Sequence, residues 1–316
     1  MTEEDGPDRR AFLTKSAAAA SITVALLLIV LKAWASVQTS STAMLGSLAD
    51  SSLDLIASLA TFIGVWIAAQ PADENHRFGH GKAESLAAMF QVMLIALSAA
   101  GIGFRAMQQL IEGGRTSAAE EGIAVSAIAI VATVALLGWQ NYVIRRTRSV
   151  AIGADHVHYQ SDLLLNLAVI AALALDQYAG WGAADPVFGL LIAGWLLWGA
   201  WRAASGAIDH LMDHEWPEEK RMRLVELAAK HPELASLHDL RTRTSGTHDF
   251  VQFHVDLPAT MTVEHAHDII ERVEADLRSH FPDMELLIHI DPEGHVDEPG
   301  NPLAEADEFD KLEKPG

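Results

Sequence analysis

The sequence from residue 48 to residue 69 reads LADSSLDLIASLATFIGVWIAA. This run is long and apolar enough to cross a bilayer as one helix, yet it carries two carboxylates, Asp50 and Asp54. Their i, i+4 spacing places both side chains on the same face of that helix. Ionisable groups are costly at bilayer depth and are usually functional there. The stretch therefore predicts a membrane helix with two candidate metal ligands on one face.

A second apolar run, HYQSDLLLNLAVIAALAL at residues 158–175, repeats the pattern with His158 and Asp162. Three carboxylates and one imidazole from two helices suit a divalent cation, zinc above all, in a four-coordinate site. Side chains of this kind can instead join helices by hydrogen bonds without binding a metal. Four of them in two matched pairs favour the metal site, and they predict a metal transporter.

Composition narrows the class of protein. Of the 316 residues 50% are hydrophobic and the mean hydropathy is +0.17, which is too apolar for an ordinary soluble enzyme. The formal net charge is −20, which argues against a nucleic-acid partner and is compatible with a cationic cargo. The chain has no cysteine, so a metal site must be built from histidine and carboxylate.

Six apolar stretches are each near the length of about 20 residues that a membrane span needs. They cover residues 12–34, 43–69, 84–110, 123–144, 150–175 and 186–208. Arginine and lysine gather before the first stretch, between the second and third, and between the fourth and fifth. By the positive-inside rule, both termini are expected in the cytoplasm. Arg9 and Arg10 also resemble a twin-arginine export signal, but the long apolar run that follows favours a retained helix.

The pattern changes after His210. The expected elements are a helix at 217–230, strands at 237–244 and 250–257, a helix at 262–280 and a strand at 284–290. This α-β-β-α-β order predicts a small α+β domain with helices on one face of the sheet. The expected organisation is a cytoplasmic N-terminal segment (1–11), a six-helix transmembrane domain (12–208), a cytoplasmic metal-binding domain (209–292) and an acidic disordered tail (293–316).

Two further clusters of ligand-type residues lie outside the apolar runs. The loop after the second run holds Asp73, His76 and His80. One carboxylate and two imidazoles can wrap a cation, although loops also carry such residues for solubility alone. The α+β domain holds a third cluster, in which the role of His248 is undecided. Its members are His238, His254, His267, His289 and Asp291.

Five motifs resemble those of a known family. They are LADSSLD at 48–54, Asp73 with GHGKAES at 79–85, HYQSD at 158–162, LHDLRTR at 237–243 and IHID at 288–291. Together they make nearly the whole chain, from the first span to Asp291, resemble the cation diffusion facilitators (CDF), in particular their bacterial YiiP-type zinc exporters. The resemblance implies an α-helical membrane protein with six transmembrane helices and a C-terminal cytoplasmic α+β (αββαβ, metallochaperone-like) domain. It also implies a homodimer in the bacterial cytoplasmic (inner) membrane.

The resemblance assigns roles to the candidate residues. The transport site maps onto Asp50, Asp54, His158 and Asp162, and the loop metal site onto Asp73, His76 and His80. The cytoplasmic site, a binuclear one bridging toward the dimer partner, maps onto His238, His254, His267, His289 and Asp291. Lys82 and Asp213 map onto a salt bridge between the two domains. Ile290 occupies a place that is polar in some relatives, which removes a possible ligand, and His248 is a candidate to replace it.

The activity implied by the resemblance is export of divalent cations from the cytoplasm in exchange for protons, by alternating access. Zinc is the expected substrate and regulatory ligand, and cadmium, iron(II) and manganese(II) stay open as alternatives. The expected partners are a second copy of the chain, protons and the lipid bilayer, without nucleic acid.

Two other classes of protein compete with a transporter: a membrane-tethered metal sensor and a membrane metalloenzyme. A zinc protease would be expected to carry His-Glu-x-x-His. The nearest string, at residues 214–218, lacks the second histidine and contains a proline. Enzyme activity is therefore not expected.

Overall fold

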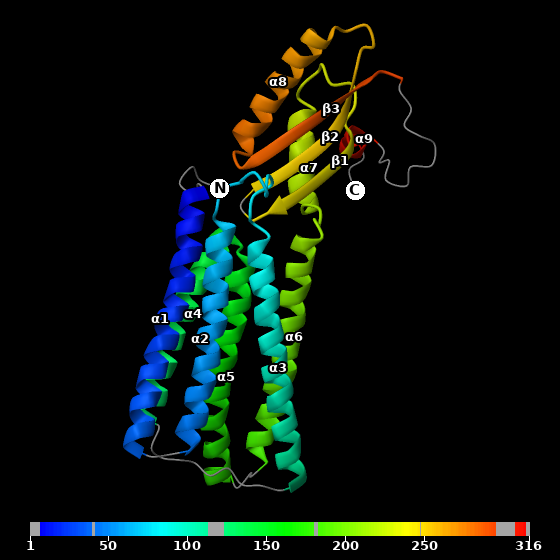
Figure 1. Cartoon of the computed structure of the whole chain (residues 1–316). Coiled ribbons are helices and arrows are strands. Elements are labelled where there is room, and N and C mark those ends of the chain that lie inside the picture. Colours follow the sequence, from blue (N-terminus) through cyan, green and yellow to red (C-terminus); the bar gives the residue numbers. More distant parts are fainter. Residues whose placement is uncertain are drawn as a thin grey trace. The chain divides into compact units, whose positions relative to one another are not determined.

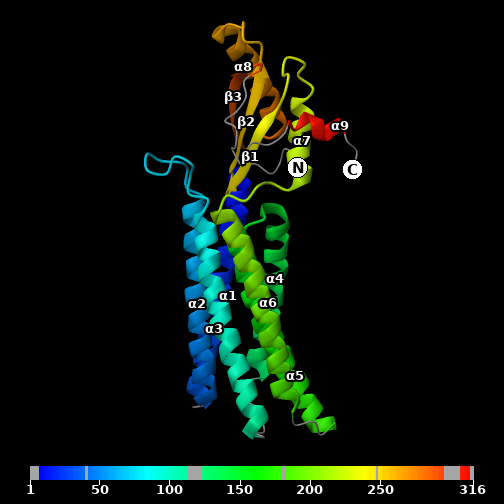
Figure 2. The same cartoon turned by 90° about the vertical axis from the view of Figure 1, so that its right-hand side faces the viewer.

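The computed structural model describes residues 7–39, 42–112, 123–179, 183–246, 248–294 and 307–313. The chain divides into two compact units, Met1–Ile208 and Asp209–Gly316. Long helices make up the described part of the first unit and run side by side (Figures 1 and 2). They are α1 (Pro7–Thr39), α2 (Thr42–Ala68), α3 (Ala83–Glu112), α4 (Ile123–Thr147), α5 (Val150–Ala179) and α6 (Ala184–Leu211).

Five of the described helices are long and apolar enough to cross a membrane, namely α1, α2, α3, α4 and α6. Helix α5 has 30 residues, and several side chains of its second half lie outside the described residues. The stretch from Asp155 to Asp162 places four ionisable side chains, two carboxylates and two imidazoles, in its first half. A sixth span through α5 therefore stays a prediction.

Small side chains let the helices of the first unit approach one another closely. Gly64 of α2 faces Ala87 of α3, and a Cβ added at residue 64 would lie 2.4 Å from the Ala87 Cβ. One buried cluster takes side chains from each of the helices α1, α2, α3, α4 and α5. Its members are Leu13, Ala17, Ala18, Val65, Ala87, Val143, Ala151 and Ile152. Another packs Ile95 of α3 against Leu196 of α6. Helix α3 thus contacts α2 on one side and α6 on another.

The second unit has the α-β-β-α-β order that the sequence predicted. Its elements are α7 (Glu218–Ala228), β1 (His238–Ser245), β2 (His248–Leu257), α8 (Val263–His280) and β3 (Met284–Pro292). The sheet order is β1-β2-β3, with β1 antiparallel and β3 parallel to β2. The register places His238 opposite His254 and His254 beside His289. Three histidines thus form one row across the sheet.

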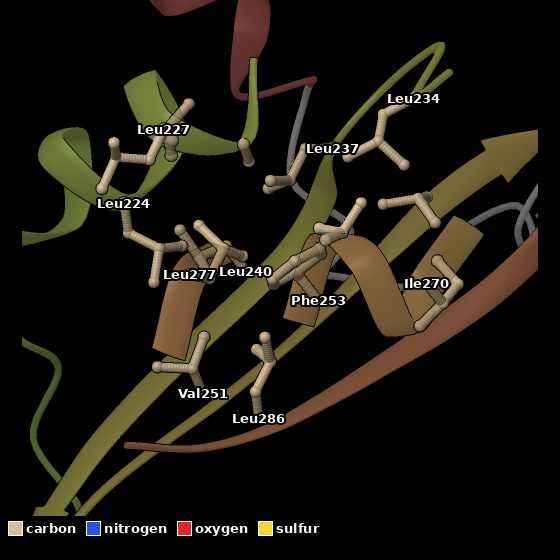
Figure 3. Packing of buried hydrophobic residues seen from close by; sticks show 14 of the residues in the cluster. Leu224, Leu227, Leu234, Leu237, Leu240, Val251, Phe253, Ile270, Leu277 and Leu286 are labelled. Atoms are coloured by element: carbon tan, nitrogen blue, oxygen red, sulfur yellow. The ribbon is translucent and has the colours of Figure 1, made fainter. Parts of the chain in front are cut away.

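The core of the second unit lies between the sheet and its two longer helices (Figure 3). Val251 and Phe253 of β2 face Leu224 of α7 and Leu277 of α8, and all four side chains are at most 1% exposed. Since side chains alternate along a strand, His254 must point to the opposite face of the sheet. The three histidines therefore lie on the face that α7 and α8 leave uncovered.

Within the expected disordered tail, residues Phe309–Glu313 form the short helix α9. Phe309 and Leu312 pack against the core of the second unit. Glu308 is 1% exposed, and its backbone N–H donates a hydrogen bond to the carbonyl oxygen of Leu237 at 2.7 Å. The acidic composition of this segment predicted disorder. Composition alone does not show that Phe309 and Leu312 pack against the hydrophobic core of the second unit.

Candidate metal sites

The first cluster of ligand-type side chains joins α2 and α5. One ligand atom each from Asp54, His158 and Asp162 lies within 4.8 Å of the others. The Nε2 atom of His158 is 3.0 Å from Oδ1 of Asp54, and the side chains are 9% and 14% exposed. A metal ion bound between these side chains would find one nitrogen, from His158, and two oxygens, from Asp54 and Asp162.

Two further polar residues, Asp50 and Asn166, lie one helical turn away from members of this cluster. Asp50, the fourth predicted ligand, lies one turn before Asp54 on α2, but its side chain falls outside the described part of the chain. Asn166 donates a hydrogen bond from Nδ2 to the backbone carbonyl of Asp162 at 2.8 Å, one turn earlier on α5. The Asn166 amide is therefore engaged with the helix backbone rather than with the predicted cluster.

The second cluster lies in the loop between α2 and α3. The two oxygens of Asp73 lie 3.2 Å from Nδ1 of His76 and 3.3 Å from Nε2 of His80. Nδ1 of His80 is also 3.2 Å from the carbonyl oxygen of Pro71. Because a carbonyl only accepts, Nδ1 carries the proton in the neutral ring and Nε2 keeps a free lone pair. This is the tautomer that a metal bound at Nε2 requires.

The same loop turns sharply around its carboxylate. The backbone N–H groups of His76 and Asn75 donate to Oδ1 of Asp73 at 2.7 and 2.9 Å. These donors, that of His76 foremost, hold the pKa of the Asp73 carboxyl below its ordinary value. Gly79 follows with a φ of 76°, a conformation that glycine adopts without strain. The turn thus presents an ionised carboxylate between two imidazoles.

The third cluster lies on the open face of the sheet, at the row of histidines. Oδ2 of Asp291 is 2.8 Å from Nδ1 of His254 and 3.6 Å from Nε2 of His238, and Oδ1 is 3.4 Å from Nε2 of His289. Asp291 is 7% exposed and sits at the centre of the group. Burial raises the pKa of its carboxyl, but the hydrogen bond from His254 and the charges of the three imidazoles outweigh burial, so the pKa is lowered. Three imidazoles around one carboxylate suit zinc.

Asp239 joins this cluster although the sequence did not single it out. The pairing of β1 with β2 shifts register between His238 and Arg241, and Asp239 has a φ of 50° inside that bulge. Its Oδ2 lies 3.7 Å from Nε2 of His254, while Arg241 contacts both of its carboxylate oxygens. A pocket of about 150 Å³ opens here, lined by Asp239, Arg241, Gln252, Phe253, His254, Leu287 and His289. A bulge has no reliable signal in a single sequence, which explains the omission.

Four other residues that the sequence analysis named are not drawn into these clusters. His267 on α8 is 68% exposed, with Nε2 3.4 Å from Glu271, and does not join the histidine row of its own chain. His248 begins β2, and six residues of strand, about 20 Å, separate it from His254. Within one chain His248 therefore lies too far from His254 to join the histidine row. Lys82 and Asp213 belong to different units, and their pairing stays a prediction.

Comparison with known proteins connects these clusters to one family. The model of the cation efflux transmembrane domain matches residues 18–212. The chain belongs to the cation diffusion facilitator family. A second model, the cytoplasmic domain of cation efflux proteins, matches residues 216–293 and covers the α+β unit.

Individual relatives agree with this family. The cation-efflux pump FieF of Cronobacter sakazakii is 42% identical over 280 residues, which cover 89% of this chain and 93% of the relative. The FieF pump of Klebsiella pneumoniae is 39% identical over 284 residues, 90% of this chain and 94% of the relative. Among solved structures, the metal-bound C-terminal domain of the CzcD transporter from Thermotoga maritima is 24% identical over 26% of this chain and 99% of that chain, with a TM-score of 0.24.

Membership in the facilitator family settles the class of protein. The chain is a multi-pass membrane transporter that exports cations, and it is not an enzyme. The prediction of a transporter is confirmed, and the metalloenzyme alternative is wrong. The cytoplasmic domain is of the metal-binding type that facilitators share, and its histidine row supplies suitable donors.

Proposed function

We propose that the chain exports divalent cations, zinc foremost, in exchange for protons by alternating access. It acts as a homodimer in the bacterial inner membrane, with six spans and both termini in the cytoplasm. The cluster of Asp54, His158 and Asp162 carries the proposal, because it places ionisable ligands from two helices together inside the helical unit. Asp50 supplies the fourth ligand from the turn before Asp54.

Proton exchange follows from the chemistry of these ligands. A metal binds the deprotonated forms of imidazole and carboxylate, so metal binding releases protons and protonation weakens metal binding. An imidazole titrates at about pH 6.5 in model peptides, near the pH on either side of a bacterial inner membrane. A cation therefore binds from the cytoplasm as protons leave, and it departs on the far side as protons return. His158 and one neighbouring carboxylate carry these protons.

Zinc is the proposed substrate because of the donor set. One imidazole and three carboxylates give nitrogen and oxygen ligands in a four-coordinate arrangement that zinc accepts readily. Cadmium, iron(II) and manganese(II) bind the same types of atom, and their order of affinity alone does not exclude them. Metal availability in the cell then decides which ion is exported.

The loop and cytoplasmic clusters are proposed as further metal sites. The loop site uses Asp73, His76 and His80. In the cytoplasmic site, Asp291 bridges His238, His254 and His289, and binding of zinc tightens the dimer and so regulates transport. His267 reaches the site of the partner, since α8 covers the sheet face opposite the histidine row of its own chain. The Lys82–Asp213 pair joins the membrane and cytoplasmic domains.

Proteoliposomes test the transport activity. With an imposed pH difference, the wild type should accumulate zinc against its gradient, and collapsing the pH difference should stop accumulation. A channel would conduct zinc without the pH difference, and a metal sensor would move none. The matched control is Glu264→Gln, which removes an exposed carboxylate from the first turn of α8 and should transport like the wild type. Failure of the wild type to accumulate any of the four metals would refute the proposal.

A further inference from the structure

Helix α5 also holds a buried carboxylate, Asp155, that the proposed transport site does not use. Asp155 lies three residues before His158, almost one helical turn away, and is 0% exposed. A buried carboxylate without a partner would be strongly unfavourable inside a membrane-spanning bundle. Its surroundings therefore show what it does.

Three side chains from three other helices donate hydrogen bonds to this carboxylate. Ser21 of α1 donates to Oδ2 at 2.6 Å, Gln140 of α4 to Oδ2 at 2.8 Å, and Gln91 of α3 to Oδ1 at 2.7 Å. All three donor residues are 0% exposed. Since donors surround both oxygens, Asp155 is held as an acceptor and is not arranged as a metal ligand. It connects α5 to α1, α3 and α4.

The orientation of the Gln140 amide is fixed by a further contact. Its Oε1 atom lies 3.2 Å from Nδ1 of His156, and an amide oxygen can only accept, so His156 donates and the amide nitrogen faces Asp155. The amide nitrogen of Gln140 (Nε2) also donates a hydrogen bond to the Ser21 hydroxyl oxygen at 3.1 Å. Ser21, Gln140 and Asp155 thus form a closed triangle of hydrogen bonds.

One turn further along α5, Tyr159 makes a second set of hydrogen bonds to other helices. Its hydroxyl donates to the backbone carbonyl of Ser21 at 3.0 Å and lies 2.9 Å from the hydroxyl of Ser58 on α2. Asp155 and Tyr159 are spaced i, i+4 and share one face of α5. His158 lies between them in sequence, and its ring centroid is 5.5 Å from that of Tyr159. These ties fix how α5 is rotated about its axis beside the transport cluster.

That rotation decides whether the transport ligands converge. Turning α5 by about 20° would move an atom about 6 Å from the helix axis by about 2 Å, from the geometry of an α-helix. A shift of about 2 Å equals a whole zinc–ligand bond. The positions of His158 and Asp162 relative to Asp54 are therefore sensitive to the hydrogen bonds at Asp155.

We propose that Asp155 is a positioning residue for the transport site: its carboxylate anchors α5 to α1, α3 and α4 and thereby aims His158 and Asp162 at Asp54. This inference rests on the proposed function, because it concerns the geometry of the same metal site. It assigns to Asp155 a structural role in binding the substrate cation, without contact to the cation.

Asp155→Asn in the full-length protein tests the inference. The variant keeps the shape of the side chain but removes its negative charge and one of its two acceptor oxygens, which weakens the charge-assisted hydrogen bonds that hold α5 to the other helices. The zinc affinity of the intramembrane site is measured in a background in which the ligands of the other two clusters are all replaced by alanine, namely Asp73, His76, His80, His238, His254, His289 and Asp291. The affinity should fall by about 10- to 100-fold, as for other groups that orient metal ligands, while the stoichiometry at saturating zinc stays unchanged. An unchanged affinity would overturn the inference, and so would loss of the bound metal at saturation, which would make Asp155 a ligand.

A donor–acceptor swap separates positioning from general damage. In Asp155→Asn with Gln140→Glu, the carboxylate of residue 140 accepts from Ser21, His156 and the new amide, and the amide oxygen at position 155 still accepts from Gln91. The zinc affinity should recover most of its loss, whereas Gln140→Glu alone sets two carboxylates against each other and should not bind normally. A swap that stays as weak as the single variant would contradict the positioning role.

The controls distinguish failure of this inference from failure of the proposed function. If the wild type binds no zinc in this background, the transport site itself is wrong. If Asp54→Ala abolishes binding but Asp155→Asn binds like the wild type, only the positioning role fails. Should Asp155→Asn fail to fold, Ser21→Ala removes one donor alone and should still weaken zinc binding, by about 3- to 10-fold given that one of three bonds is lost. Wild-type affinity in Ser21→Ala would then refute the inference.

Discussion

Nε2 of His158 lies 3.0 Å from Oδ1 of Asp54, although the two residues are 104 positions apart in the sequence. This contact ties α5 to α2 through two ionisable groups inside the helical unit. In a membrane such a pair is stable when the two groups share a proton or a cation. The alternation between those two states is the chemical basis of the proposed exchange of a metal for protons.

Asp162→Asn should abolish zinc uptake into proteoliposomes while leaving the dimer intact. The amide keeps the size of the side chain but removes the negative charge and one anionic ligand, which we expect to reduce uptake by at least about 100-fold. Uptake is measured by a zinc-sensitive dye inside the vesicles, and the dimer by size-exclusion chromatography. Transport by this variant at the wild-type rate would remove Asp162 from the site.

The cytoplasmic cluster should release zinc on mild acidification because of its histidines. The pKa of Asp291 is lowered in the folded protein, so its stabilising contribution is complete above the ordinary carboxyl pKa of about 3.9 and is lost only as pH falls toward the folded-state pKa. Between pH 7 and pH 5 this contribution is constant. Competition between protons and zinc for the imidazole nitrogens then accounts for the loss of zinc in that range.

The matching variant is Asp291→Asn, studied in full-length protein whose transport and loop ligands have been replaced. Its zinc affinity should be about 10- to 100-fold weaker at every pH from 5 to 7, while the slope of the logarithm of affinity against pH is unchanged. Isothermal titration at several pH values measures both quantities. A flatter slope in the variant would show that Asp291 itself takes up protons in this range, contrary to the account.

The close contact of α2 with α3 predicts a pair of compensating substitutions. Gly64→Ala places a methyl group 2.4 Å from the Ala87 Cβ, which is too short for two carbon atoms, so the helices must separate. We expect a cost of about 1–3 kcal/mol and a lower melting temperature in detergent. Gly64→Ala with Ala87→Gly should recover most of that loss, since the methyl group moves from one helix to the other. Equal melting temperatures for wild type and Gly64→Ala would contradict the packing described.

The α9 segment should stabilise the beginning of β1. Removing residues 307–316 takes away Phe309, Leu312 and the hydrogen bond from Glu308 to Leu237. Hydrogen exchange of the first β1 amides should therefore be faster in this truncated protein than in the full-length protein. Leu312→Ala should have a smaller effect in the same direction, of about 1–2 kcal/mol for a partly buried leucine. Asp310→Ala, at an exposed position, is the control and should exchange like the wild type.

The sequence predicted the helix pairs and the metal-type ligands because their signals are local. Asp50 and Asp54 are two carboxylates on an otherwise apolar run, and His158 with Asp162 repeats their spacing, so the meeting of the two helices could be anticipated from chemistry. The alternation of apolar and polar residues around Phe253 similarly indicates which face of β2 is buried and which carries His254. In each case the information lies within one or two turns of chain.

Features that depend on partners far away in the sequence were not predicted. Asp155 stands three residues before His158, but its role depends on donors from α1, α3 and α4 that no local pattern connects to it. Asp239 reaches the histidine row only because β1 bulges. An intramembrane carboxylate near the predicted ligands is the one signal that could have drawn attention to Asp155.

The central claim is that Asp54, His158 and Asp162, with Asp50, hold the exported cation. X-ray absorption spectroscopy of zinc bound to full-length protein in which the loop and cytoplasmic ligands are all replaced by alanine tests it most directly. The account predicts one zinc ion per chain with four nitrogen or oxygen ligands at about 2.0–2.2 Å, including one imidazole, and its loss in Asp54→Ala. Zinc that stays bound in Asp54→Ala with an unchanged spectrum would contradict the account.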